Sequence, residues 1–353
     1  MNFTYQEPDA AADDLRRAYL DGVDAYIRAR NAEAYAAEPA RVQAVLRDPE
    51  TARAEFCRML GAPLDAPVTE VPTLLHREKL FTERGVTASR MQFCVLGCIP
   101  FYGILYVRDE SRPAPFALVS HGGMGTPELC SGLLSGGSAN YNDMVTRVLD
   151  RGLNVFAPQL LLWALNRFPV RDRDDQPQDE LRLRRDDRLK KTGSSITALE
   201  IYALRAVLNY FERQPYVDPR RIGMAGLSYG GFYTLMTTAA EPRIRAALSG
   251  SAFNDRLCVD FPDWTWASSA VRFPDSAVLA LIAPRPIWIA VGRSDPLFRI
   301  ENAQASYDRF AAAAGAAGSS VHFVPFDGDH EFCPMDAPLD AFAAALRGEA
   351  NAQ

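Results

Sequence analysis

The stretch 226–230, Gly-Leu-Ser-Tyr-Gly, places a serine between two glycines where an apolar run changes into a helical pattern. A Gly-x-Ser-x-Gly sequence between a strand and a helix is typical of a nucleophile elbow, a sharp turn that exposes a reactive serine. Glycine is needed at both flanks because side chains there would collide with neighbouring backbone. The alternative is a tight glycine turn with an incidental serine. The context favours Ser228 as a nucleophile for acyl transfer.

A nucleophilic serine needs a general base, and the chain offers only four histidines. His76 lies far upstream, and His121 ends an apolar run before a glycine loop, which it is placed to shape. His322 alternates with apolar residues inside a predicted strand. His330 follows Asp-Gly-Asp, a turn-favouring sequence, in the loop after the last predicted strand. We predict that His330 is the base; an ordinary surface histidine is the alternative.

The acid that orients this base is expected between the serine and the histidine, in the order Ser, Asp, His. Several aspartates lie there: Asp255, Asp260, Asp263, Asp275 and Asp295. Asp295 follows the apolar run 287–291, so its loop can bring the carboxylate to the edge that holds the serine. Asp255 is the runner-up by the same reasoning, one strand earlier. Asp295 is therefore the predicted acid.

An oxyanion hole requires two N–H groups aimed at one point. The backbone amide of Tyr229 directly follows the serine and begins a predicted helix, whose N-terminal end favours negative charge. The second donor is expected in the loop 121–125, His-Gly-Gly-Met-Gly, where missing side chains let backbone approach a substrate. Gly123 is the predicted donor and Met124 the alternative.

Alternating elements are predicted to position these residues. Strands are expected at 115–121, 154–158, 221–226, 244–250, 286–292 and 321–326, helices at 197–213 and 229–240, and two more short strands around 97–100. Such alternation favours parallel strands, because a parallel connection needs a crossover. The sheet is expected to continue past the serine by three strands.

The chain is expected to divide into an N-terminal helical segment, 1–90, and a catalytic domain, 91–348. The spacing of Leu15, Tyr19, Val23 and Tyr26 predicts an amphipathic helix. An insertion at 160–191 ends in a run of eight basic and seven acidic residues, which predicts either a solvated face or a lid. We expect this insertion and the N-terminal helices to form a cap over the serine.

The composition of the chain disfavours several classes of binding partner and cofactor. The chain has 353 residues, 48% of them hydrophobic, and a net charge of −6, which disfavours binding to nucleic acid or to an anionic membrane. Its first residues do not resemble a secretory signal, and no apolar run is long enough to span a bilayer, so a cytoplasmic location is expected. Six scattered cysteines predict reduced thiols. No Cys/His spacing predicts a metal, and no cofactor is expected.

Four stretches in order, SHGGMG, GLSYGG, GRSDPLF and GDHEF, resemble the motifs of the α/β-hydrolases from about residue 91 to 348. The chain is most similar to the branch with dienelactone-hydrolase-like and acetyl-xylan-esterase-like enzymes, bacterial carboxylesterases and prolyl-oligopeptidase-type catalytic domains. The serine at position 228 differs from the cysteine of the dienelactone hydrolases proper. The N-terminal helices resemble those of C–C-bond hydrolases. This resemblance implies an α/β fold with a mostly parallel central sheet flanked by helices.

The expected function is hydrolysis of a small-molecule carboxylic ester through an acyl-enzyme. Alternatives are a C–C-bond hydrolase, an amide or peptide hydrolase, and a non-catalytic binding protein on the same scaffold. The substrate pocket is expected to include His121, Phe261, Trp264 and Trp266, with Trp163 from the insertion. Packing against the sheet is the alternative for the two later tryptophans. The sequence leaves room for a homodimer.

Overall fold

A twisted nine-stranded sheet forms the centre of the computed structural model, which describes residues 4–134, 139–161 and 178–349. The spatial order of the strands is β1-β2-β3-β5-β4-β6-β7-β8-β9. Their bounds are β1 Thr73–Glu83, β2 Val86–Val95, β3 Ile99–Val107, β4 Ala114–Ser120, β5 Asn154–Pro158, β6 Val217–Leu227, β7 Ile244–Gly250, β8 Ile287–Gly292 and β9 Val321–Phe326.

Two kinds of pairing make up the sheet. The strands β1, β2, β3 and β5 pair antiparallel, whereas β5, β4, β6, β7, β8 and β9 pair parallel. Ligands of open parallel sheets bind outside the carboxyl ends of the strands. Those ends, and the loops that follow them, carry the residues of the candidate site.

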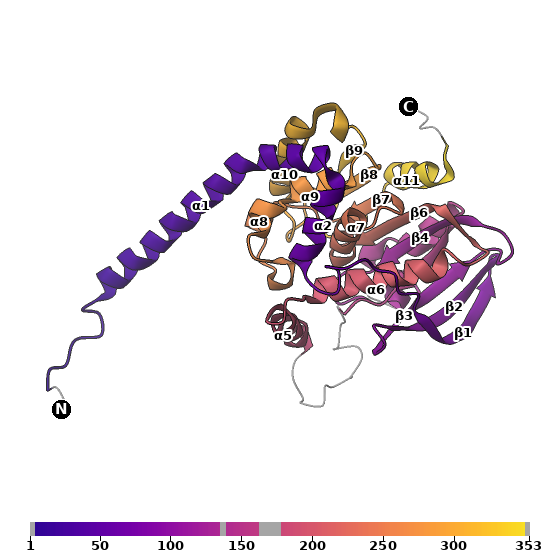
Figure 1. Cartoon of the computed structure of the whole chain (residues 1–353), viewed down its shortest axis with the longest axis horizontal. Coiled ribbons are helices and arrows are strands. Elements are labelled where there is room, and N and C mark those ends of the chain that lie inside the picture. Colours follow the sequence, from indigo (N-terminus) through magenta and orange to yellow (C-terminus); the bar gives the residue numbers. More distant parts are fainter. Residues whose placement is uncertain (1–3, 135–138, 162–177, 350–353) are drawn as a thin grey trace.

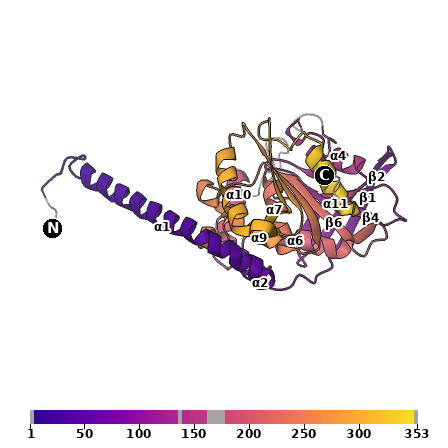
Figure 2. The same cartoon turned by 90° about the horizontal axis from the view of Figure 1, so that it is seen from above.

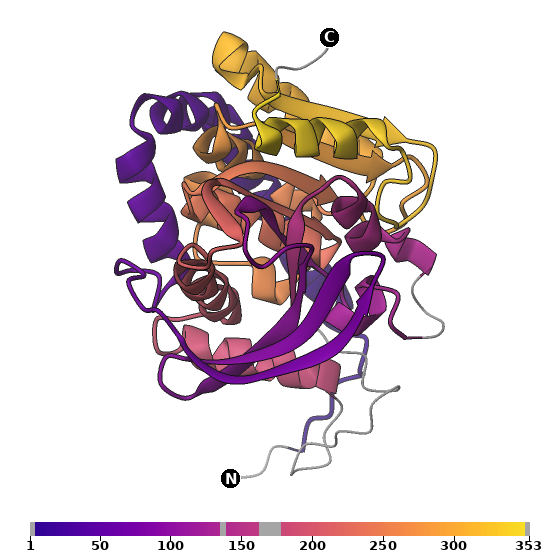
Figure 3. The same cartoon turned by 90° about the vertical axis from the view of Figure 1, so that its right-hand side faces the viewer.

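Helices cover both faces of the sheet. One face packs against α2 Pro49–Leu60, α6 Ile196–Phe211, α7 Tyr229–Ala240, α9 Asp275–Ile282 and α10 Ile300–Ala314, and the other against α3 Pro127–Cys130, α4 Met144–Asp150 and α11 Ala337–Arg347. In Figure 3 the indigo α2 and the magenta α3 and α4 lie on opposite sides of the molecule. The two hydrophobic cores separate because alternate strand residues face opposite sides.

Smaller helices connect the main elements. These are α5 Gln178–Lys190, α8 Ser269–Arg272 and the 3₁₀ turns η1 Ala139–Tyr141, η2 Arg256–Cys258, η3 Pro262–Trp264 and η4 Gly315–Gly318. Local chemistry fixes several helix starts. The Ser195 side chain, for example, accepts the Ala198 amide and caps α6.

The predicted alternation of strands and helices is confirmed, including the three strands after the serine. The first 90 residues differ from the prediction, because helix gives way to strand at β1 and the proposed boundary at residue 91 falls inside β2. Most residues of β1 are exposed on both faces of this edge strand. It therefore lacks the apolar alternation by which a strand is recognised.

The first helix, α1 Asp13–Arg47, projects from the body of the molecule (Figures 1 and 2). Its C-terminal part packs against α8, α9 and α10, and α2 packs against α6, α7 and α9. The helix is thus confirmed, and α2 packs on one face of the sheet. They bury apolar surface there because Val42 and Val45 meet the core of that face.

The described residues contain neither a membrane-spanning helix nor a disulfide bond. No helix in the described ranges is long and apolar enough to cross a bilayer. All six cysteines are free thiols, as predicted. Cys94 belongs to β2, whereas Cys98 lies in the turn that leads to β3.

Candidate active site

Ser228 occupies a strained turn between β6 and α7. Its φ of 58° and ψ of −123° lie in a region that L-residues rarely adopt. Its amide donates to the carbonyl oxygen of Gly250 at 2.8 Å, which fixes the turn against the end of β7. A Cβ on Gly226 would lie 2.4 Å from Gly230, and one on Gly230 would lie 2.1 Å from the Ser120 oxygen. Both glycines are therefore required by close backbone contacts.

His330 and Asp295 meet across two loops at the carboxyl edge of the sheet. Nδ1 of His330 lies 2.9 Å from Oδ2 of Asp295, whose side chain is fully buried. The other carboxylate oxygen accepts the amides of Leu297 and Phe298 at 2.9 and 3.0 Å. Burial alone would raise the pKa of Asp295, but the hydrogen bonds from His330 and the two amides outweigh burial and lower it. The carboxylate is therefore ionised at neutral pH and accepts the Nδ1 proton.

The loop of His330 lies against the strand end that holds Ser228. Oγ of Ser251 donates to the Glu331 carbonyl oxygen at 3.1 Å, and Ser251 directly follows the glycine that binds the Ser228 amide. The Phe298 ring stacks on the imidazole with centroids 5.6 Å apart. Among the described residues, no hydrogen bond joins Ser228 directly to His330. Such contacts are often long in unliganded enzymes and tighten when substrate binds.

The rival residues have other partners. Asp255, the runner-up acid, accepts a hydrogen bond from Tyr35 at 3.0 Å and pairs with Arg309 at 2.6 Å. His322 lies on β9 and stacks on Trp288 with centroids 5.3 Å apart. Of these candidates, only His330 and Asp295 are joined to each other.

His121 is locked inside the loop that follows β4. It is fully buried, its Nδ1 lies 2.8 Å from the Gly122 oxygen, and its Nε2 accepts the Leu160 amide at 3.0 Å. Because Nε2 is an acceptor, the proton must be on Nδ1 and the ring is neutral. Burial lowers the pKa of His121 to about 4, which is consistent with a neutral ring. The prediction that His121 faces substrate is wrong, because both nitrogens are engaged within the protein.

The glycine loop lies directly on the elbow. A Cβ on Gly122 would lie 3.1 Å from the Ser228 Cβ, and one on Gly123 would lie 3.3 Å from the Tyr229 ring. The Gly122 amide donates to the Tyr141 hydroxyl at 3.1 Å and is therefore occupied. In the described part of the chain we find no acceptor for the Gly123 amide. Tyr141 had no recognisable signal in the sequence, since it lies far along the chain from the loop.

The predicted pocket aromatics form a packed cluster beside Tyr229. Trp264 stacks on Phe232 with centroids 4.0 Å apart and meets the Tyr229 ring edge-on at 5.0 Å. Phe261 packs 4.7 Å from Trp264. Trp264 and Trp266 are both buried. Trp163 lies outside the described residues.

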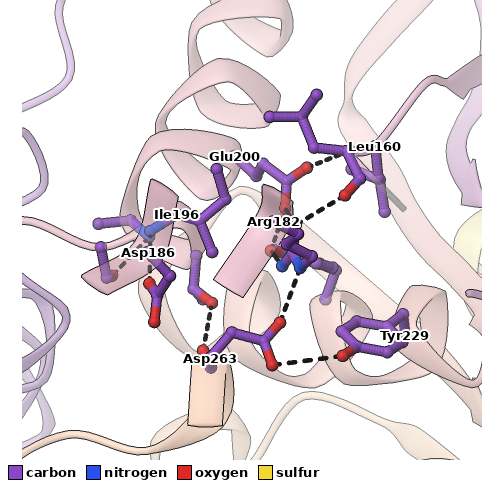
Figure 4. Close-up of polar contacts among 12 residues, drawn as sticks. Leu160, Arg182, Asp186, Ile196, Glu200, Tyr229 and Asp263 are labelled. Atoms are coloured by element: carbon purple, nitrogen blue, oxygen red, sulfur yellow. Dashed lines mark hydrogen bonds and ion pairs between the residues drawn. The ribbon is translucent and has the colours of Figure 1, made fainter. Parts of the chain in front are cut away.

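The charged run in the insertion contains a buried cation. The Arg182 guanidinium, on α5, donates to Asp263 at 2.7 Å, Glu200 at 3.1 Å and the Tyr233 hydroxyl at 2.9 Å. Figure 4 shows Arg182 between Glu200 and Asp263, with Tyr229 on the other side of Asp263. The Tyr229 hydroxyl donates to Asp263 at 3.3 Å. The network thus joins the insertion to the residue that follows Ser228.

Within the described part of the run, Arg182 and Asp186 depart from the predicted solvated face, whereas Arg184, Asp187, Arg188 and Lys191 are exposed. The side chains of Arg182, Glu200 and Asp263 are at most 7% exposed, and Asp186 is also buried, where it accepts the Ile196 amide at 3.0 Å. Burial alone would lower the pKa of Arg182. The neighbouring Tyr233, Glu200 and Asp263 outweigh burial and raise this pKa well above its usual value. Sequence composition could not reveal this burial, because the partners lie on other helices.

We expect Arg182→Met to destabilise the fold strongly. The change leaves Glu200 and Asp263 buried without their cation, and breaking such a buried ion pair costs about 3–5 kcal/mol. Urea unfolding followed by circular dichroism measures the loss. The matched control is Lys191→Met, which removes an exposed ion pair with Asp187 in the same region and should change the midpoint little. Equal midpoints for Arg182→Met and the parent chain would contradict a stabilising role.

The described residues contain no group of three or more His, Cys, Asp or Glu side chains arranged to hold a metal ion. A strained serine, a histidine oriented by an ionised carboxylate and a helix N-terminus can together perform nucleophilic acyl transfer.

Comparisons with known proteins find similarity to hydrolases. The model of the prolyl oligopeptidase family matches residues 200–274. YtaP of Bacillus subtilis, whose name describes it as a hydrolase without giving a substrate, is 25% identical over 76% of this chain and 88% of its own length. A glucuronoyl esterase from Solibacter usitatus has a TM-score of 0.60 at 14% identity and covers 83% of this chain and 91% of its own.

A further solved structure, acetyl xylan esterase 1 from Thermoanaerobacterium, has a TM-score of 0.56 at 14% identity, and the match covers 85% of this chain and 93% of that one. The family match includes the elbow and the segment that carries Asp263 and Trp264. Together with the parallel sheet and the strained serine, these similarities support a serine hydrolase. The chain has the α/β-hydrolase fold.

Proposed function

We propose that the protein hydrolyses carboxylic esters with Ser228 as nucleophile, His330 as general base and acid, and Asp295 as the group that orients His330. Oγ of Ser228 attacks the ester carbonyl carbon while Nε2 of His330 takes the hydroxyl proton. The tetrahedral intermediate collapses, the bond to the alcohol oxygen breaks, and His330 returns the proton to the leaving alcohol. Water then attacks the acyl-enzyme with the same proton exchange and releases the acid.

The observation that carries this proposal is the bond between His330 and the buried Asp295. That bond holds the imidazole with the proton on Nδ1, so Nε2 is free to accept the serine proton. The strained conformation of Ser228 supports the proposal, because backbone strain persists where function maintains it.

The proposed oxyanion hole consists of the Tyr229 amide and the Gly123 amide. Tyr229 is the first residue of α7, and the first amides of a helix have no partner within it. A Cβ on the adjacent Gly122 would lie 3.2 Å from the Leu227 carbonyl oxygen, so the glycine loop runs beside the backbone of the elbow. Met124, the alternative donor, follows at a positive φ of 57° with an exposed side chain.

Turnover of p-nitrophenyl acetate tests the proposal directly. Parallel assays with an amino-acid p-nitroanilide and a vinylogous 1,5-diketone separate ester, amide and C–C bond cleavage. Ester turnover well above the other two supports the proposal. Preference for the anilide would instead agree with the prolyl oligopeptidase match, and no turnover of any substrate would favour a binding protein. We further propose a cytoplasmic location, which the six free thiols support.

We expect Asp295→Asn to lower kcat by roughly 10³ to 10⁴, because a neutral amide no longer stabilises the imidazolium or fixes its tautomer. Asp255→Asn serves as the matched control, since Asp255 pairs with Arg309 instead of His330. It should keep most of the parent kcat and lose mainly stability. Steady-state kinetics with p-nitrophenyl acetate measure both variants. The reverse ranking would show that the wrong aspartate has been assigned.

A further inference from the structure

We propose that the projecting part of α1, residues 13–33, is the dimer interface between two copies of this chain. Figures 1 and 2 show this part of the helix extending away from the body. With a rise of 1.5 Å per residue it is about 30 Å long. It carries six large apolar side chains that are at least 40% exposed, namely Leu15, Tyr19, Leu20, Val23, Tyr26 and Ile27. An apolar surface of this kind marks an interaction site.

The exposed apolar surface continues a face that already packs. In the C-terminal part of α1, Ala34, Glu38, Val42 and Val45 are buried against the body. Leu20, Val23 and Ile27 precede them at helical spacing and lie on the same side of the helix. The contacts of α1 with α8, α9 and α10 end where the helix leaves the body. The apolar face of the helix continues beyond that point. A second apolar helix can therefore extend the same packing.

Charge favours a second copy in antiparallel orientation. In a parallel symmetric pair Asp13 and Asp14 would lie beside the same residues of the partner. In an antiparallel pair centred on Asp21, Asp14 lies beside Arg28 of the partner subunit, and Arg28 beside the partner's Asp14. Twofold symmetry of this kind is the commonest for homo-oligomers. It also places the two bodies at opposite ends of the paired helices.

A membrane surface fits less well. Residues 13–33 contain five acidic and four basic residues, whereas helices that lie on anionic bilayers are rich in lysine and arginine on their polar face. The helix therefore lacks the attraction to lipid headgroups that such binding requires. Burial of its apolar face against another copy needs no net positive charge.

Sedimentation velocity of the full chain tests the interface. We expect the parent chain to sediment at twice its mass of 39.0 kDa and Leu20→Glu/Ile27→Glu at that mass itself. Both side chains are exposed in the single chain, so the variant should fold and keep the parent circular dichroism spectrum. Leu75→Glu, at an exposed leucine on β1, is the matched control and should remain dimeric. A monomeric parent chain, or a dimeric double variant, would overturn the proposal.

A charge exchange tests the orientation without changing an apolar residue. Arg28→Asp should raise the dissociation constant of the dimer, and the addition of Asp14→Arg should restore it. No restoration would overturn the antiparallel arrangement. Flotation with vesicles of phosphatidylcholine and phosphatidylglycerol provides the remaining arm. If the parent chain is monomeric and floats with these vesicles, the exposed face of α1 binds a membrane and the dimer proposal is overturned.

Discussion

Ser228→Ala is expected to abolish turnover of p-nitrophenyl acetate and labelling by a fluorophosphonate probe. The probe reacts with an activated serine hydroxyl, and no other group at the elbow can form the acyl-enzyme. Loss of the nucleophile in a Ser-His-Asp enzyme costs about 10⁶ in kcat. The fold should be retained, because a methyl group replaces a hydroxymethyl group and the amide contact to Gly250 is made by backbone.

Mass spectrometry of the labelled protein provides the second readout. One adduct is expected in the parent chain, on the peptide that contains Ser228. Ser111→Ala, in the turn between β3 and β4, is the control and should label as the parent chain does. If Ser228→Ala were labelled to the same extent as the parent chain, the nucleophile would lie elsewhere and the proposed mechanism would be lost.

His330→Ala is expected to lower kcat by roughly 10⁴ or more. Without a base the serine hydroxyl must lose its proton to water, and only binding and the oxyanion hole remain. The imidazole is partly exposed in a loop, with 19% of the side chain accessible, so its removal should affect stability little. Steady-state kinetics and thermal unfolding of the same preparation separate the two effects.

His322→Ala is the control for this prediction. His322 pairs with Trp288 across β8 and β9, and its ring stacks on that indole. Loss of the ring should therefore lower the unfolding midpoint and leave most of kcat. An inactive but well-folded His322→Ala, together with an active His330→Ala, would show that His330 is not the base.

Much of the fold could be predicted because its signals are local. The strands β5, β7 and β9 cover the predicted residues 154–158, 244–250 and 321–326. Each is an apolar run bounded by turn residues, and a buried parallel strand needs little else to be recognised. The edge strand β1 was not predicted, because it lacks such an apolar run. Its residues are mostly exposed and polar, so pairing with β2 rather than side-chain burial makes it a strand.

Some contacts of the candidate site could be predicted from the sequence and others could not. The contact between His330 and Asp295 follows from chain order and from the position of each residue after a strand. The buried role of Arg182 does not, because charged residues are almost always exposed and its partners lie 18 to 81 residues away. The pocket assignment of His121 failed because the Leu160 amide that binds its ring comes from a different loop.

The sequence alone determined which residues could form an elbow, since glycine spacing, strand and helix are adjacent along the chain and the turn is a local structure. Chain order and strand position favoured Asp295 over Asp255, but only the tertiary structure supplies the contacts that separate the two aspartates. Both follow a strand of the parallel sheet, and only the packing of α1 and α10 brings Tyr35 and Arg309 to Asp255 and leaves Asp295 for His330. Tertiary structure also decided that the apolar face of α1 is half buried and half exposed. The periodicity of a helix specifies a face, but the surface that covers the face comes from distant parts of the chain or from another molecule.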